Sequence, residues 1–338
     1  MPVLKQMTVG SESIPLTLPG LVPVGTPENS STAERRDLAQ TGLRVHPIAL
    51  GTSVFGWTAQ TADCELILDR YAELGGNFLD TADSYSAGRS EHIIGSWMSR
   101  RGVRDQSVIA TKIGRHPDNP GLGSVSIVRA VEASLERLQT DYIDVLYFHD
   151  DDPTVPLEDA LGTVEWLIES GKVRHLAVSA YRPERLVQAR ILAASGYPRI
   201  AAVGTHYSLL HRSSYEGTLE LVSRGQNLAV VPYLTLENGF LSGKYRSRAQ
   251  LDTTARGTRV SSLVNRQGLR ALQVLDRVAE EQGVTPTTIA LAWVLSRPGI
   301  TAPVVSANDP EQVDALMAAP AISLTRAQSA ELEKVWHS

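Results

Sequence analysis

Eight short apolar segments alternate with amphipathic segments along this chain of 338 residues, and the alternation limits the folds that it can adopt. The apolar segments span residues 45–50, 77–79, 107–111, 142–148, 173–178, 200–203, 228–232 and 300–305. Each has the length of a buried strand, whereas the segments between them repeat apolar residues at helical spacing. Strands that alternate with helices form a parallel sheet. Eight such units predict a closed (β/α)8 barrel.

The same patterns predict how the remaining segments are organised. Residues 1–35 are rich in proline, serine and glycine, so we expect an irregular extension before a single barrel domain of residues 36–338. The turn at residues 40–42 predicts an N-terminal hairpin over one end of the barrel. Ser90 is expected to cap a helix that runs to Trp97. Extra helices are expected near the C-terminus, at residues 267–282, 286–295 and 326–336.

Composition excludes several classes of function. A net charge of -5 without a basic cluster argues against nucleic-acid binding. No apolar run approaches the roughly 18 residues of a membrane span, and the N-terminus does not resemble a secretory signal. The single cysteine, Cys64, fits a reducing compartment. We therefore expect a cytoplasmic protein that acts on a small molecule, while the sequence leaves its oligomeric state open.

Four ionisable residues follow the predicted strands: Asp80, Tyr85, Lys112 and His149. In a barrel these strand ends meet at one face, so the four residues predict one active site. Lys112 is expected to favour the phenolate and lower the pKa of Tyr85, while Asp80 holds the lysine. Tyr85 then acts as a general acid near neutral pH. With His149 orienting a carbonyl oxygen, the set suits carbonyl reduction, for which a cofactor supplies the hydride.

Six stretches carry a resemblance to a known family. They are residues 75–85, 110–114, 146–149, 171–174, 207–212 and 239–246. These stretches resemble the signatures of the aldo-keto reductases, and the resemblance extends from about residue 36 to the end of the chain. It implies NADPH-dependent reduction of an aldehyde or ketone to an alcohol, with Tyr85 as the general acid, and NADH as a possible alternative cofactor.

The resemblance also implies a cofactor site. Tyr207 would stack against the nicotinamide, and Ser179 would bond its carboxamide. The pyrophosphate would lie along Leu236, Asn238, Gly239 and Lys244. The adenosine end would lie near Ser306, Asn308, Glu311 and Gln312, where a helix N-terminus favours phosphate.

Three positions depart from the family pattern. Ala180 stands where the family usually has asparagine, and Gly204 stands where it usually has glutamine. Both missing amides would normally hold the carboxamide, and each lost hydrogen bond costs about 1 kcal/mol. Asn308 stands where many relatives have an arginine for the 2′-phosphate of NADPH. The sequence thus leaves the choice between NADPH and NADH open.

The substrate is less constrained. Phe55, Trp57 and Asp150 are candidates for the pocket wall, and no histidine has the spacing of a metal ligand. A sugar dehydrogenase, oxidising an aldose or lactol with NAD(P), and a keto-sugar reductase remain alternatives within the same superfamily. A regulatory subunit that binds the nucleotide with little turnover is an alternative of another class.

Overall fold

The computed structural model describes residues 33–251 and 257–335. An irregular extension was expected for residues 1–35, and residues 1–32 of it lie outside the described residues. None of the described helices is both long and apolar enough to span a bilayer.

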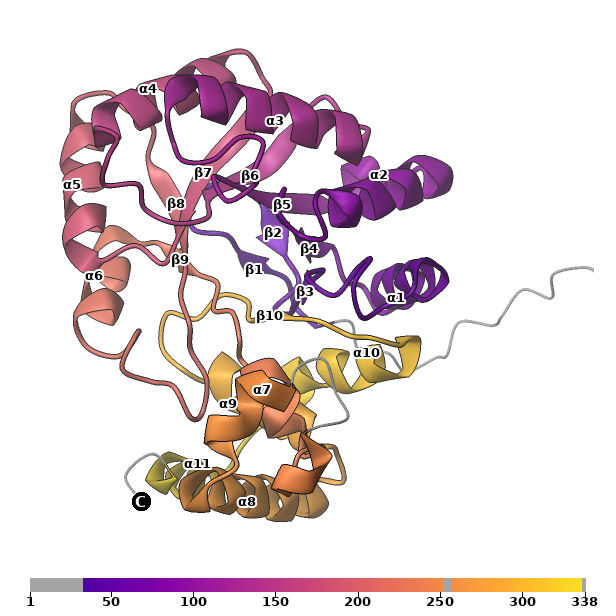
Figure 1. Cartoon of the computed structure of the whole chain (residues 1–338). Coiled ribbons are helices and arrows are strands. Elements are labelled where there is room, and N and C mark those ends of the chain that lie inside the picture. The colour runs from indigo at the N-terminus through magenta and orange to yellow at the C-terminus, as the bar shows by residue number, and fades with distance from the viewer. Residues whose placement is uncertain (1–32, 252–256, 336–338) are drawn as a thin grey trace, which may run out of the picture. The chain divides into compact units, whose positions relative to one another are not determined.

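Eight parallel strands form the centre of the fold (Figure 1). They lie in the order β10-β3-β4-β5-β6-β7-β8-β9. Their bounds are β3 Ala49–Gly51, β4 Phe78–Asp80, β5 Val108–Ile113, β6 Ile143–Phe148, β7 Val173–Ser179, β8 Ile200–Gly204, β9 Ala229–Val230 and β10 Val304–Val305. The two ends of this order, β9 and β10, are joined as well. Val230 pairs in parallel with Ile300, and the Val304 N–H donates to Pro232 O at 2.8 Å. The predicted barrel is confirmed.

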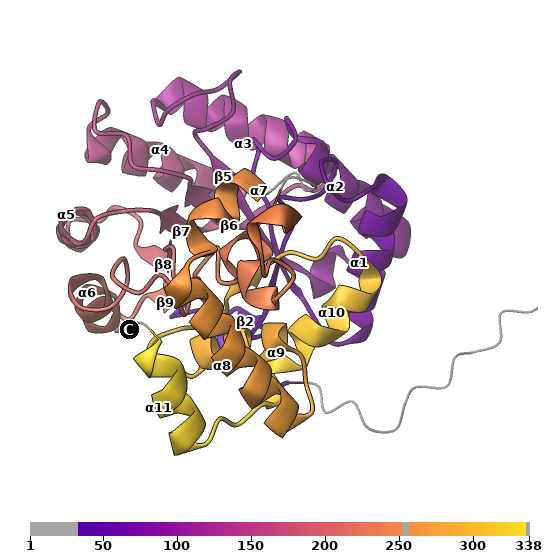
Figure 2. The same ribbon diagram turned by 60° about the horizontal axis from the view of Figure 1, so that its bottom comes forward.

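Helices surround the strands, as Figures 1 and 2 show from two directions. Those that follow β3 to β8 are α1 Thr61–Glu73, α2 Arg89–Arg101, α3 Ser124–Leu138, α4 Leu157–Glu169, α5 Pro183–Ala194 and α6 Thr218–Gln226. The C-terminal part adds α7 Gly257–Val260, α8 Arg266–Gln282, α9 Pro286–Leu295, α10 Pro310–Met317 and α11 Arg326–Lys334. The start of α9 at Pro286 matches the predicted helix over residues 286–295, and α5 also starts at a proline. Proline favours the first helical position because the N–H that it lacks has no partner within the helix there.

The prediction that Ser90 caps a helix is wrong. Helix α2 begins at Arg89, and its cap is Gly88, which has a left-handed backbone. The Ser90 side chain is fully buried and donates instead to Thr52 O at 3.1 Å. It thereby joins the start of α2 to the loop after β3, a tertiary contact that local sequence does not reveal.

The expected hairpin is present and plugs the barrel. Strand β1 (Arg36–Asp37) pairs antiparallel with β2 (Arg44–Val45). Leu38 and Val45 are fully buried and belong to the same apolar cluster as Phe78 and Val108, which lie on the central strands. The predicted strand over residues 45–50 is split, because proline at position 47 has no N–H for a strand ladder.

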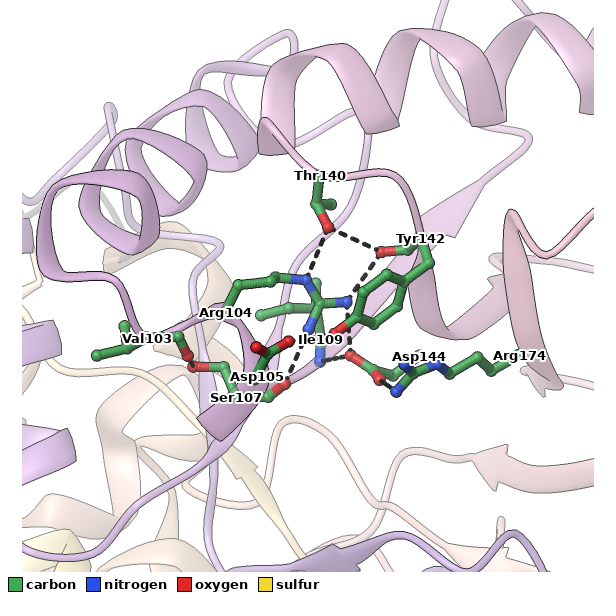
Figure 3. Close-up of polar contacts among 9 residues, drawn as sticks. All are labelled: Val103, Arg104, Asp105, Ser107, Ile109, Thr140, Tyr142, Asp144 and Arg174. Atoms are coloured by element: carbon green, nitrogen blue, oxygen red, sulfur yellow. Dashed lines mark hydrogen bonds and ion pairs between the residues drawn. The ribbon is translucent and has the colours of Figure 1, made fainter.

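A buried charge network fixes the starts of three neighbouring strands (Figure 3). The Asp144 carboxylate, 2% exposed, pairs with Arg104 and Arg174 at 2.9 Å each and accepts from the Ile109 N–H. Both guanidinium groups lie 3.8 Å from the centroid of the Tyr142 ring. β5, β6 and β7 are thus tied together at the end opposite to the predicted active site.

Candidate active site

The four residues predicted for catalysis lie together at the carboxyl ends of the strands. Asp80 ends β4, Lys112 lies near the end of β5, and His149 follows β6. Lys112 Nζ donates to Asp80 Oδ1 at 2.6 Å and to Thr81 O at 2.9 Å. Asp80 and Lys112 are 3% and 6% exposed, so this ion pair is formed away from water and is held rigidly.

Tyr85 is carried by a tight turn after β4. Ser86, Ala87 and Gly88 adopt successive positive φ angles of 50°, 53° and 84°, and Ser86 Oγ donates to Phe55 O at 2.8 Å. The Tyr85 ring centroid lies 5.3 Å from Lys112 Nζ and 6.0 Å from the His149 ring, which it meets edge-on. The turn therefore places the phenol over the ammonium group.

Burial has the largest effect on the pKa of Tyr85. It raises the pKa of Tyr85 above its usual value, and Lys112 opposes the shift. The expected net lowering of the Tyr85 pKa is therefore wrong for this structure, although the lysine acts in the predicted direction. Burial also disfavours the Lys112 ammonium, but Asp80 and Tyr85 outweigh it and raise the pKa of Lys112. The phenol thus keeps its proton beside a permanent cation.

His149 is a neutral hydrogen-bond donor in this setting. Burial lowers the pKa of His149 to about 2, and the charges of Lys112 and Arg115 contribute in the same direction. The ring is 6% exposed, and its Nδ1 has no hydrogen-bond partner among the described residues. An uncharged imidazole can orient a carbonyl oxygen without competing with Tyr85 as the acid.

The four residues line a single cavity of about 950 Å³, which is near the upper end of the volumes of small-molecule sites. Most of the residues predicted to bind cofactor or substrate line it as well. These are Ser179, Leu236, Asn238, Gly239, Lys244, Ser306, Asn308, Gln312 and Trp57. Phe55, Asp150, Tyr207 and Glu311 do not line the cavity.

The prediction that Tyr207 stacks on the nicotinamide is wrong. Tyr207 is fully buried, its hydroxyl donates to Glu216 at 2.7 Å, and its ring packs on Trp293. Tyr233 lines the cavity instead. His206 pairs with Tyr233 across the strand ends, so Tyr207, one residue further, points to the opposite side. Tyr233 directly follows the predicted strand of residues 228–232, and this position could have identified it as a residue of the cavity wall.

Three other residues predicted to bind the substrate or the cofactor also lie outside the cavity wall. Phe55 is fully buried in the hydrophobic core, away from the cavity. Asp150 binds Arg115 through both carboxylate oxygens, and it is Arg115 that lines the cavity. Glu311 lies exposed in the first turn of α10. Arg115 was not among the predicted binding residues. Arg259 also lies in the cavity wall.

One part of the cavity fits a pyrophosphate. Asn238 and Gly239 have φ angles of 55° and 88° inside a short 3-10 turn, Glu237–Ser242. A Cβ on Gly239 would lie 3.3 Å from Lys244 Nζ, so glycine lets the lysine fold against the backbone. Successive left-handed residues beside an ammonium group form an anion-binding concavity. These residues fit the diphosphate bridge of a dinucleotide cofactor.

The part of the cavity predicted to hold the carboxamide lacks the two amide side chains that the family has at positions 180 and 204. Ala180 has a φ of 57°, a conformation that asparagine adopts more readily than alanine. Its N–H donates to Gly204 O at 2.9 Å. A Cβ added to Gly204 would make ordinary contacts of 3.6 Å with Ser179, so space for a side chain exists. Ser179 is therefore the side chain left to bind the amide here.

At the other end of the cavity, Asn308 is held by its neighbours. Its Oδ1 accepts from Thr58 Oγ1 at 2.7 Å, and its N–H donates to Gln312 Oε1 at 3.1 Å. Asp309 caps α10 by accepting from the Gln312 N–H at 2.9 Å. Over the described ranges, no three His, Cys, Asp or Glu side chains are grouped to hold a metal ion.

Comparison with known proteins extends these observations. The sequence profile of the aldo/keto reductase family matches residues 47–337. The chain is 32% identical to an aryl-alcohol dehydrogenase of Pestalotiopsis microspora, over 91% of this chain and 84% of that protein. It is 30% identical to a norsolorinic acid reductase of Emericella nidulans, over 86% of this chain and 78% of that protein.

A relative of another kind is similar to nearly the same extent. The chain is 29% identical to a probable voltage-gated potassium channel subunit beta of Oryza sativa subsp. japonica. That match covers 82% of this chain and 88% of the relative. Similarity over the whole barrel is thus shared with proteins named as oxidoreductases and with proteins named as channel subunits.

Proposed function

The chain belongs to the aldo/keto reductase family, and from this premise we propose that it reduces an aldehyde or ketone to an alcohol with NADPH as hydride donor. The observation that carries the proposal is the Lys112–Asp80 ion pair of 2.6 Å beneath Tyr85, with His149 beside the phenol. An oxidoreductase activity also agrees with the names of the relatives.

Each residue has one role in the proposed reaction. His149, uncharged, donates a hydrogen bond to the carbonyl oxygen and orients the substrate. Tyr85 gives its proton to that oxygen as negative charge develops there. The cationic Lys112 stabilises the phenolate that remains, and Asp80 keeps the ammonium in place. The cofactor, when bound, supplies the hydride to the carbonyl carbon.

The cofactor part of the proposal rests on the chain's own residues. The turn at Asn238 and Gly239 with Lys244 fits the pyrophosphate, and Ser179 is available to the carboxamide. We propose NADPH as the main cofactor and NADH as a possible second one. The missing side chains at Ala180 and Gly204 predict weaker binding of the nicotinamide half.

Replacing Tyr85 tests the proposal. In the Tyr85→Phe variant we expect carbonyl reduction to be abolished and NADPH binding to stay within about twofold, because only the phenol proton is lost. Aryl aldehydes are the first substrates to assay, since one relative is named an aryl-alcohol dehydrogenase. Reaction rates are followed by NADPH absorbance, and binding by nicotinamide fluorescence. Retention of most of the turnover would remove Tyr85 from the acid role.

The direction of the reaction and the preferred substrate distinguish the carbonyl reductase from the sugar dehydrogenase and the keto-sugar reductase. Initial rates are measured in both directions, with simple aldehydes and NADPH, and with aldoses and NAD(P)⁺. Faster oxidation of an aldose would favour a sugar dehydrogenase. Faster reduction of a keto-sugar than of an aryl aldehyde would favour a keto-sugar reductase.

A second function, a nucleotide-binding subunit with little turnover, is favoured by two observations. Relatives named as potassium channel beta subunits match across the barrel, and two carboxamide-binding side chains are missing. Rapid mixing of the NADPH-loaded protein with a reactive aryl aldehyde tests it. Fluorescence quenching on binding without any hydride transfer would support the subunit function.

We further propose a cytoplasmic location, which the buried free thiol of Cys64 supports. Burial raises the pKa of Cys64 to about 11, so the thiol is protected and needs no disulfide partner. Fractionation of cells that produce the tagged chain tests this proposal.

A further inference from the structure

Arg115 lies in the cavity wall beside the residues proposed for catalysis, and the proposed reaction gives it no role. It stands on the loop after β5, the strand that carries Lys112. The next loop is held close by, because the His149 N–H donates to Ile113 O at 3.0 Å. Burial and Lys112 have the larger effects on the pKa values of Tyr85 and His149, and the charge of Arg115 acts to lower both. Arg115 is therefore near the two groups that would meet a carbonyl oxygen.

Asp150 binds one edge of the Arg115 guanidinium group. Arg115 Nη2 donates to Asp150 Oδ1 at 2.6 Å, and Arg115 Nε donates to Asp150 Oδ2. Arg115 Nη1 makes no hydrogen bond with any residue that the structure describes. A guanidinium group has five N–H donors in one plane, so the Nη1 side stays available to a ligand in the cavity that Arg115 lines.

The pairing with Asp150 determines which ligand groups suit Arg115. The pair has no net charge, and Asp150 directly follows His149 in the chain. A carboxylate at Arg115 Nη1 would be attracted by the guanidinium group and repelled by the Asp150 carboxylate, and it would lose hydration. An uncharged oxygen accepts the same N–H without that repulsion. The other cations of the cavity wall, Lys244 and Arg259, lie on segments after β9, so they leave this balance unchanged.

Hydroxyl groups beside Tyr85 add to the polarity of this part of the wall. Ser84 and Ser86 flank Tyr85, and both line the cavity. Ser86 Oγ donates to Phe55 O, which leaves its lone pairs free, and Ser84 Oγ is without a hydrogen bond to the described part of the chain. The surroundings of the proposed acid thus offer hydrogen bonds without an excess of either charge.

We propose that Arg115 binds the substrate and selects carbonyl compounds that carry an uncharged oxygen substituent, such as an ether or hydroxyl group, over compounds that carry a carboxylate. This assignment rests on the proposed carbonyl reduction. Arg115 Nη1 donates to the substituent, while His149 and Tyr85 meet the carbonyl oxygen. Asp150 acts as a positioning residue, because it holds the guanidinium group and cancels its charge.

The test measures the Kd values of aryl aldehydes by calorimetry, for the full chain with excess NADP⁺. NADP⁺ has no hydride to give, so the aldehydes bind without being reduced. The ligands are the meta and para isomers of methoxybenzaldehyde, ethylbenzaldehyde and carboxybenzaldehyde. The methoxy and ethyl groups are similar in size, but only the methoxy oxygen accepts a hydrogen bond. For the wild type we expect a Kd about tenfold lower for a methoxy isomer than for its ethyl counterpart, with carboxybenzaldehyde no tighter than the ethyl compound.

Two variants separate the roles of the ion pair. Arg115→Met keeps the length of the side chain but removes its donors, so the preference for methoxy over ethyl should fall to within about twofold. Asp150→Asn keeps an oxygen for Arg115 Nε and leaves the guanidinium charge uncancelled. It should tighten carboxybenzaldehyde at least about tenfold relative to methoxybenzaldehyde. Arg101→Met is the matched control: Arg101 forms a similar two-bond pair with Asp69 and does not line the cavity, so the preferences should not change.

Three results would overturn the assignment. They are equal Kd values for methoxy and ethyl compounds in the wild type, tighter binding of carboxybenzaldehyde than of methoxybenzaldehyde by the wild type, and a methoxy preference that persists in Arg115→Met. Reduction of these aldehydes with NADPH is measured in parallel. Turnover without a methoxy preference would refute the assignment and leave the proposed function standing. A methoxy preference in a protein that reduces none of the aldehydes would uphold the assignment and refute the proposed enzymatic function instead.

Discussion

Asp83 lies between Asp80 and Tyr85, and its burial predicts an unusual dependence of stability on pH. It is 1% exposed, and its carboxyl oxygens make no hydrogen bond of good geometry with the described residues. Burial, and after it the Glu91 carboxylate, raise the pKa of Asp83 to about 7. Arg137 and two backbone N–H groups oppose this shift without cancelling it.

The sign of the effect follows from proton binding. Between pH 4 and pH 7 the native state keeps a proton that the unfolded state, with its ordinary carboxyl pKa, has released. The native state binds more protons, so the free energy of unfolding falls as the pH rises through this window and levels off above pH 7. At 1.36 kcal/mol per pH unit, the loss between pH 5 and pH 8 is about 3 kcal/mol.

Asp83→Asn removes this titration. We therefore expect the variant to gain about 3 kcal/mol relative to the wild type between pH 5 and pH 8. Guanidinium unfolding curves at both pH values give the free energies. Asp152→Asn is the control: hydrogen bonds from Thr154 and the Leu122 N–H lower the pKa of Asp152, so its carboxylate is ionised at both pH values. Its effect on stability should not change between them.

Parallel pH profiles for wild type and Asp83→Asn would refute the reasoning. Such a result would mean that Asp83 is ionised throughout the window and that its cost of burial is met by Arg137 and the backbone. The comparison is independent of enzymatic activity, because it measures only the free energy of unfolding.

Three further substitutions test other parts of the structure. Asp144→Asn should lower the free energy of unfolding by about 3 kcal/mol, because it removes the buried carboxylate that pairs with the largely buried Arg104 and with Arg174. Asp150→Asn, in an exposed pair, should cost less than about 1 kcal/mol, and urea unfolding curves measure both variants. Ala180→Asn should raise the melting temperature, because asparagine relieves the left-handed strain of about 1 kcal/mol, and should also tighten nicotinamide binding. An unchanged or lower melting temperature would show that the asparagine side chain meets an obstacle.

The sequence by itself determined the barrel. Alternating apolar strands and amphipathic helices leave few arrangements that bury both, so the strand order, the hairpin and the proline-started helices followed from local patterns. The grouping of Asp80, Lys112 and His149 followed as well, because the ends of parallel strands meet at one face.

The tertiary structure alone decided which way side chains point and what surrounds them. Tyr207 and Tyr233 both follow strands, but the alternation of the paired strand ends turns one into the core and the other into the cavity. The net pKa shift of Tyr85 depends on how much water is excluded, which several loops set together. The closeness of Arg259 to Trp57 joins residues 202 positions apart in sequence, and no local pattern encodes such a contact.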